Sequence, residues 1–276
     1  MLFRRALSVC VVVVSLASPL FAQTNPSLFP RFGISAGGYL TDYGTTVRVD
    51  PHIEGLQGTT IDLEHDLGLT SSKTLTRASL EWRPFQRHEF ELAYFRTQRR
   101  GHLSLDKQIV YEDTTFPLHA DLHSKFDIDY WDASYTYWAR QTATNGIGAN
   151  IGVMGMSFNG ELTGSVAGTT ATLQQDATAD VPLPVIGVEG RWGLGSHIAT
   201  SLRGSFLPRV SFRDYKGQAY LARASAEYDV ANWLGLGVGY NYLNVNGSAD
   251  KPNFHANLDM TVRGVEAFVH LVFGGR

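Results

Sequence analysis

The sequence predicts an all-β fold, an antiparallel up-and-down transmembrane β-barrel of about ten strands, with eight to twelve as the range. Three observations predict it. Apolar and polar residues alternate with a period of two over most of the chain. Four of the five tryptophans lie within a few residues of a short turn. Beyond the N-terminus no apolar run is long enough for a membrane helix, and a closed barrel is the other structure that satisfies the backbone in lipid.

The first 22 residues have the organisation of a secretory signal peptide. Arg4 and Arg5 precede an apolar run at residues 6–16, and Ala22 is the small residue before the expected cleavage point. The run is shorter than the roughly 20 residues of a spanning helix, which argues against an N-terminal anchor. The single cysteine, Cys10, lies in this run, so the mature chain would have no thiol for a disulfide, a nucleophile or a metal site.

Charge and length favour one domain that does not bind nucleic acid. The chain has 23 basic and 26 acidic residues, and removing Arg4 and Arg5 leaves 21 basic residues and a net charge of −5. Nucleic-acid-binding domains carry a basic patch or stripe, which the sequence does not show. No Pro-, Gly- or Ser-rich linker divides the chain, so we expect a short segment at residues 23–30, one barrel at 31–273 and a tail at 274–276.

The longest two-faced stretch, residues 116–140, gives the orientation expected for the strands. Because side chains alternate along a strand, one face carries apolar residues and the other carries ionic residues. We expect the apolar face to contact lipid and the ionic face to line the lumen. The apolar set is Leu118, Ala120, Leu122, Phe126, Ile128 and Tyr130, and the ionic set is His119, Asp121, His123, Lys125, Asp127 and Asp129.

The same alternation predicts the remaining elements in chain order. Strands are expected at residues 32–50, 78–82, 90–94, 116–140, 147–153, 186–192, 198–206, 222–228, 234–242 and 265–273. Short turns are expected at residues 84–88, 141–146, 193–197 and 229–233, and longer loops at 55–72, at 160–180 and near Ala249. A short strand at 59–63 fits inside the first long loop, and another pair between 47 and 74 would make twelve strands. The alternation changes phase between Gln98 and Leu103, as a bulge or an exit from the membrane would cause.

Aromatic residues gather near the expected strand ends. Trp and Tyr concentrate at the boundary between hydrocarbon and water, and membrane barrels carry such girdles at both rims. The alternative is that these are ordinary core tryptophans, each with a partner for its N–H group. The residues assigned to the girdle are Trp82, Trp138, Trp192, Trp233, Tyr240, Tyr242 and Phe273.

The signal peptide, the two-faced strands, the aromatic strand ends and the apolar final strand that ends at Phe273 together resemble the outer-membrane β-barrels of Gram-negative bacteria. The resemblance implies outer-membrane lipid and lipopolysaccharide as partners. It also implies passage through the export and barrel-insertion machinery, which reads a terminal aromatic residue, although Gly274, Gly275 and Arg276 follow that residue here. No subfamily is identified, and the oligomeric state stays open, with a monomer expected.

The polar strand faces would then line a narrow lumen. Buried charges need partners of opposite sign, and the mixture of signs predicts a network of ion pairs across the barrel. Gly235, Gly237 and Gly239, on the polar side of one strand, fit the narrow part of such a lumen. The residues expected in the network are Arg77, Glu81, Arg83, Glu89, Glu91, Asp121, His123, Lys125, Asp127, Asp129, Glu189, Arg191, Arg203, Arg223, Glu227, Glu266 and His270.

We therefore expect a non-enzymatic barrel without a cofactor, whose role is structural, surface interaction or slow diffusion of small solutes. Two alternatives stay open. One is a hydrolase embedded in the membrane, of the protease or lipid deacylase type. The other is a soluble secreted barrel whose apolar faces enclose a ligand cavity.

The chemistry-bearing residues gather on one predicted strand. Asp121 with His123, and Asp127 with Asp129, resemble the Asp/His and carboxylate pairs of the omptin proteases, but here both pairs lie on one strand instead of facing each other across a cleft. A deacylase needs a His and a Ser on one lipid-facing side, and the adjacent His123 and Ser124 point opposite ways. The candidate metal site is the set that shares one face, His119, Asp121 and His123.

Overall fold

The computed structural model describes residues 28–51, 58–104, 109–111, 114–116, 121–166, 169–175, 183–212, 214–250 and 254–274. The expected signal peptide, Cys10, Leu118, His119 and Ala120 lie outside these residues. Within the described ranges, no helix is long and apolar enough to cross a bilayer.

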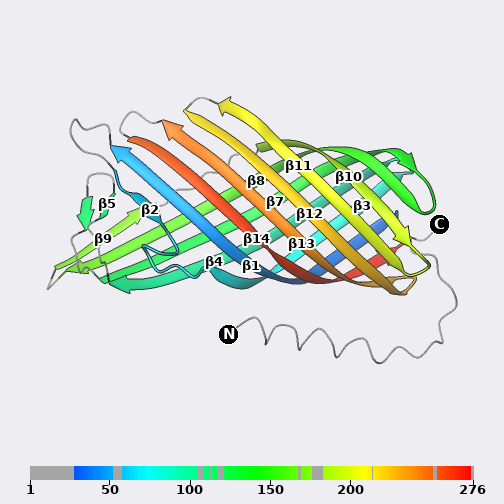
Figure 1. The fold of residues 1–276 in the computed structure, drawn as a ribbon, viewed down its shortest axis with the longest axis horizontal. Helices are drawn as coiled ribbons and strands as arrows, with labels where there is room; N and C mark the ends of the chain where they lie inside the picture. Colours follow the sequence, from blue (N-terminus) through cyan, green and yellow to red (C-terminus); the bar gives the residue numbers. More distant parts are fainter. Residues whose placement is uncertain are drawn as a thin grey trace.

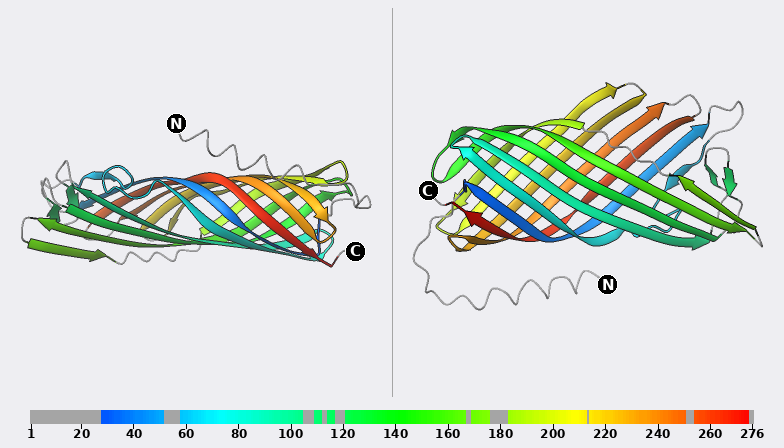
Figure 2. Two further views of the ribbon diagram at one scale, coloured as in Figure 1. Left: turned by 90° about the horizontal axis from the view of Figure 1, so that it is seen from below. Right: turned by 180° about the vertical axis from the view of Figure 1, so that it is seen from behind.

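Ten long strands close into a barrel (Figures 1 and 2). They pair antiparallel in the order β10, β11, β12, β13, β14, β1, β3, β4, β7 and β8, and β8 pairs with β10 to complete the ring. This is the up-and-down arrangement and the strand number that the sequence predicts. The ten strands are β1 (Phe32–Pro51), β3 (Ser72–Phe85), β4 (His88–Ser104), β7 (Asp121–Gln141), β8 (Asn145–Val166), β10 (Leu183–Leu194), β11 (Ile198–Phe212), β12 (Tyr215–Ala231), β13 (Leu234–Asp250) and β14 (Phe254–Phe273).

Four short strands lie toward the opposite end from the C-terminus (Figure 1). β2 (Thr60–Asp62) pairs with β1, which confirms the short strand expected there. β5 (Ile109–Tyr111) and β6 (Thr114–Phe116) form a hairpin, and β9 (Thr169–Gln175) pairs with β8. Two expected loops need correction. β8 and β9 occupy most of residues 160–175, because the end of β8 pairs with the threonine-rich β9. Only residues 251–253 separate β13 from β14.

The barrel has a turn end and a loop end. The turn end carries the four short turns predicted from the sequence, together with the first described residue, Leu28, and the end of β14. The loop end carries the remaining connections, including those that hold β2, β5 and β6. Figure 2 shows the green strands β7, β8 and β9 reaching farthest toward the loop end, where β4 ends beside the start of β7.

The polarity of the two faces of the wall reverses part-way along the strands, while the inward positions stay buried and the outward ones exposed. Toward the turn end, the outward side chains are apolar and exposed, such as Leu92 and Tyr94, whereas the inward neighbour Glu91 is buried. Toward the loop end, the inward Phe95 is buried and the outward Arg96 is exposed. We call this change the crossover level. The last apolar outward residue and the first polar one beyond it are Tyr94 and Arg96 on β4, Trp131 and Asp129 on β7, Tyr220 and Gln218 on β12, Tyr242 and Asn244 on β13, and Val265 and Arg263 on β14.

The apolar belt on the turn-end side has the height of a thin membrane. On β14 it runs over the nine residues from Phe273 to Val265, about 27 Å along the strand, which is about 20 Å along the axis at a tilt of about 40°. The phase change expected near Gln98 is this exit from the belt and not a bulge, because the β4–β7 register runs without a shift from His88 to Ser104.

The two faces of β7 beyond the crossover level are opposite to those expected. Ile128 and Tyr130 are 1% and 5% exposed and belong to the apolar core, and Phe126 packs against it. His123 is exposed, and Asp129 lies beside the outward Arg96. His123, Lys125, Asp127 and Asp129 therefore lie on the outer face. The reason is that this part of the strand has left the belt, so water and not lipid favours the side chains that point outward.

Candidate functional site

The turn end of the lumen is filled by the segment that precedes β1. Leu28 and Phe29 are buried, and the Phe29 ring meets Trp138 edge-on at 4.8 Å between centroids. Trp138 is completely buried, and its Nε1 donates a hydrogen bond to Glu89 Oε2 at 3.2 Å. The assignment of Trp138 to the outer girdle is therefore corrected: its ring lies inside, where an apolar partner and a hydrogen-bond acceptor are both present.

Arginine side chains of the barrel wall bind the segment that precedes β1 through hydrogen bonds. Arg191 Nη1 donates to the carbonyl of Leu28, and Arg83 Nε donates to that of Pro30, both at 3.2 Å. The same Arg191 contacts Glu89 at 2.5 Å, Glu189 at 2.8 Å and Glu81 at 3.6 Å. One guanidinium thus joins three strands to the N-terminal segment.

A second group of charges crosses the middle of the lumen. Glu91 on β4 contacts Arg203 on β11, and lies 3.8 Å from Arg77 on β3 and 3.9 Å from Arg223 on β12. Glu266 on β14 lies 3.5 Å from both Arg77 and Arg223. Asn241 Nδ2 also donates to Glu266 Oε2 at 3.0 Å. We call Arg77, Glu91, Arg203, Arg223 and Glu266 the ionic layer; it is level with the apolar belt outside.

Glycine makes room for this packing on β13. A Cβ atom at Gly237 would collide with the ring of Phe268, and one at Gly235 would collide with the carboxylate of Glu227. That carboxylate accepts a hydrogen bond from His270 Nδ1 at 3.0 Å. The glycines therefore lie where inward side chains from β12 and β14 fill the space.

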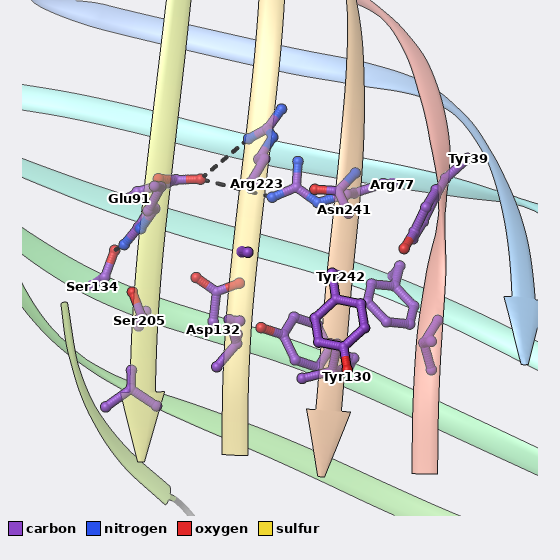
Figure 3. Close-up of a pocket in the computed structure, with 18 residues that line it drawn as sticks. Tyr39, Arg77, Glu91, Tyr130, Asp132, Ser134, Ser205, Arg223, Asn241 and Tyr242 are labelled. Carbon is purple, nitrogen blue, oxygen red and sulfur yellow. Dashed lines mark hydrogen bonds and ion pairs between the residues drawn. The ribbon is translucent and has the colours of Figure 1, made fainter. Parts of the chain in front are cut away.

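Two small cavities lie along the lumen, and both are lined by Glu91, Arg203 and Arg223. The cavity toward the turn end has a volume of about 80 Å³ and reaches Leu28 and His270. The other has a volume of about 90 Å³ and lies between the ionic layer and the apolar core. Figure 3 shows this second cavity, with Glu91, Arg223 and Arg77 at one end and Tyr130 at the other.

An apolar core fills the lumen directly beyond the ionic layer. The core there includes Tyr39, Phe95, Tyr130, Met156 and Met260. No sequence argument placed a hydrophobic core in this half, because the apolar residues of the long stretch were assigned to lipid.

At the loop end, residues 58–69 close the gap left by the shorter strand β3. Ile61, Leu63, Leu67 and Leu69 are buried, and Leu69 forms a β-bridge with Gly101. The fully buried Arg99 contacts Glu64 of this segment, and its Nη2 donates to Thr45 Oγ1 at 3.1 Å. Ser124 Oγ donates to the Leu67 carbonyl at 2.8 Å. The described part of this loop is thus packed onto the inner wall.

The structure divides the residues expected in the lumen into two groups. One group lies on the inward face, and the other, which comes entirely from β7, lies on the outer face; the side chain of Asp121 is outside the described part of the chain. The inward group is Arg77, Glu81, Arg83, Glu89, Glu91, Glu189, Arg191, Arg203, Arg223, Glu227, Glu266 and His270, and the outward group is His123, Lys125, Asp127 and Asp129.

Sequence reasoning missed several inward residues. Asp132 lines the larger lumen cavity beside Tyr130 (Figure 3), although its neighbour Trp131 points outward. The signal for Asp132 was available, because it alternates with Trp131 and lies inward if that tryptophan faces lipid. Phe29 carries no such signal, since it lies outside any alternating stretch.

The outward charges of β7 form local pairs and not a catalytic arrangement. Asp129 Oδ1 accepts a hydrogen bond from the Tyr94 hydroxyl at 2.8 Å and lies 3.5 Å from Arg96. Asp127 lies 3.5 Å from Lys125. Among the described residues, no group of three or more His, Cys, Asp or Glu is placed to hold a metal ion.

The expected girdle residues other than Trp138 are exposed on the outer face. Trp82, Trp192, Trp233 and Phe273 lie near the turn end of the belt. Tyr240 and Tyr242 lie near the crossover level. Both borders of the belt therefore carry aromatic side chains.

No protein-family model and no curated protein matches the sequence. Among solved structures, the chain is similar to the outer membrane protease OmpT from Escherichia coli, with a TM-score of 0.54 and 10% identity over 87% of this chain and 97% of that one. It also aligns with the outer membrane protein OprG from Pseudomonas aeruginosa, with a TM-score of 0.36 and 12% identity over 92% and 100% of the two chains. The chain has the fold of a bacterial outer-membrane β-barrel. This fold and the apolar belt together place it in the outer membrane.

Proposed function

We propose that the chain is a non-enzymatic outer-membrane barrel with a sealed lumen, which acts as a structural or surface-interaction protein or at most passes small solutes slowly. The observation that carries this proposal is the succession of fillings along the lumen: Phe29 with Trp138, the ionic layer, the apolar core, and residues 58–69. Each filling is anchored to several strands. Short turns face the periplasm in such barrels, so the loop end faces outside the cell.

The extracellular half provides the surface for interactions. Beyond Trp131, at the crossover level, β7 continues for ten more residues to Asp121, about 34 Å along the strand. Its outer face is polar and ionic, which suits contact with other molecules in water. We further propose that the aromatic residues at the borders of the belt are its interfacial girdle, and that outer-membrane lipid, lipopolysaccharide and the barrel-insertion machinery are partners.

Conductance in planar bilayers tests the sealed lumen. The wild-type barrel is expected to give no stable channel steps. A porin, whose lumen is a water-filled channel, serves as the positive control in the same bilayers. Phe29→Ala combined with Trp138→Ala removes only the periplasmic filling and is expected to stay closed, because the ionic layer, the apolar core and residues 58–69 remain. Large and stable conductance of the wild-type barrel would refute the proposal.

A protease role has only the fold in its favour. OmpT is a protease, and at 10% identity its likeness to this chain concerns the fold alone. Here His123 faces outward and Ser124 inward, and the carboxylates Asp127 and Asp129 lie on the same strand as His123 instead of opposite it. Peptide cleavage that disappears in His123→Ala would favour the protease role over the one proposed.

A further inference from the structure

Two histidines from neighbouring strands stack against each other on the outer face of the extracellular half. His102 on β4 and His123 on β7 are register partners. Their ring centroids are 4.4 Å apart, the rings are inclined by 29°, and both side chains are exposed. We propose that this pair binds one divalent transition-metal cation, of the Zn²⁺ or Cu²⁺ class, through one nitrogen of each imidazole, with water completing the coordination.

The backbone already holds the two rings at nearly the required separation. A tetrahedral Zn²⁺ has Zn–N distances of about 2.0–2.1 Å, so two ligand nitrogens are about 3.4 Å apart. The observed centroid separation is 4.4 Å. Rotation of the two exposed rings about their side-chain bonds brings one nitrogen of each within bonding distance of a single metal ion, and the strands do not need to move.

The surrounding charges select the kind of metal. Arg100 and Lys125 occupy the adjacent rung of the same face and disfavour a cation held by charge alone. Lys125 is offset in part by Asp127 at 3.5 Å and has the exposed Glu161 as its register partner on β8. Hard cations such as Ca²⁺ and Mg²⁺ need oxygen ligands, whereas Zn²⁺ and Cu²⁺ bind neutral imidazole strongly. The site therefore takes the second class.

This site differs from the one that spacing along the sequence suggested. That earlier candidate joined His119, Asp121 and His123 on one strand, and His119 lies outside the described part of the chain. His102 is far from His123 in sequence and becomes its neighbour only through the β4–β7 register. The proposal does not depend on whether the lumen is sealed, so it stands or falls separately from the proposed function.

Calorimetric titration of Zn²⁺ into the folded barrel in detergent, prepared without a polyhistidine tag, tests the site. The wild type is expected to bind one Zn²⁺ per chain. His102→Ala and His123→Ala are each expected to weaken binding roughly tenfold or more, because the second ligand no longer acts at high effective concentration. His255→Ala, which removes a histidine that lies 3.6 Å from Asp250 and stacks on no other histidine of the described residues, serves as the matched control.

Spectroscopy with Cu²⁺ provides a second readout. Electron paramagnetic resonance is expected to show two coordinated nitrogens in the wild type and in His255→Ala, and one in either variant of the pair. Absence of Zn²⁺ binding, binding that persists unchanged in His102→Ala, or equal loss in His255→Ala would each overturn the proposal.

Discussion

Replacing Glu266 by Gln tests whether the ionic layer stabilises the barrel. The Glu266 side chain is 1% exposed and lies 3.5 Å from both Arg77 and Arg223. At an effective dielectric constant of about 20, each of these pairs has a gross Coulomb energy of about 5 kcal/mol. Glu91, which also lies near Arg77 and Arg223, compensates part of the loss. We therefore expect Glu266→Gln to lower the free energy of unfolding by about 3–5 kcal/mol, the usual cost of breaking a buried pair.

Urea unfolding of the barrel in lipid vesicles, followed by tryptophan fluorescence, measures this change. Glu161→Gln is the matched control, because it removes an exposed carboxylate on the outer face, and it is expected to change the free energy of unfolding by less than about 0.5 kcal/mol. The double variant Arg223→Gln with Glu266→Gln is expected to recover part of the loss, because it removes an uncompensated charge. If Glu266→Gln unfolds like the control, water screens the layer and the reasoning fails.

Three further substitutions test the walls and the filling of the barrel. Ile128→Ala is expected to cost about 2–5 kcal/mol in the same unfolding assay and Asp129→Ala less than about 1 kcal/mol, whereas similar losses would contradict the inward placement of Ile128. Leu236→Arg on the belt is expected to cost about 2–4 kcal/mol in bilayers while Asn246→Arg beyond the crossover level costs about 0–1 kcal/mol, and equal costs would move the membrane boundary. Trp138→Ala is expected to cost about 3–5 kcal/mol, because it leaves Phe29 without its partner; a cost near zero would show that the N-terminal segment adds no stability.

The strands and the turn-end connections were predictable from local pattern. Alternation of two faces and clusters of turn formers depend on a few neighbouring residues, so β10 to β14 appeared near their observed positions. The segment at residues 160–175 was misread as a loop because small and threonine residues on β8 and β9 give weak alternation, although they pair well with each other. Pairing between segments is a tertiary property that alternation within one segment does not report.

The filling of the lumen was predictable only in part. Inward charges such as Arg77 and Glu266 share a strand face with other polar residues, so they could be assigned from alternation. The partners of these charges could not be assigned. Arg77 on β3 and Glu266 on β14 come together only because both strands pair with β1. Trp138 was assigned to the wrong side for another reason: a tryptophan beside a turn has the same sequence signature whether its ring points to lipid or into the lumen.

The reversed faces of β7 follow from the two solvents that surround the barrel. Alternation along a strand shows which side chains share a face, but the surrounding solvent decides which of the two faces points outward. Around the belt that solvent is hydrocarbon, so polar groups such as Glu91 turn inward and satisfy one another there. Beyond Trp131 it is water, so Ile128 and Tyr130 turn inward and Asp129 turns outward, as in a soluble barrel. The inner and outer surfaces must therefore change polarity at the same level. The inner surface changes from the charged Glu91 to the apolar Phe95, and the outer surface from Tyr94 to the charged Arg96.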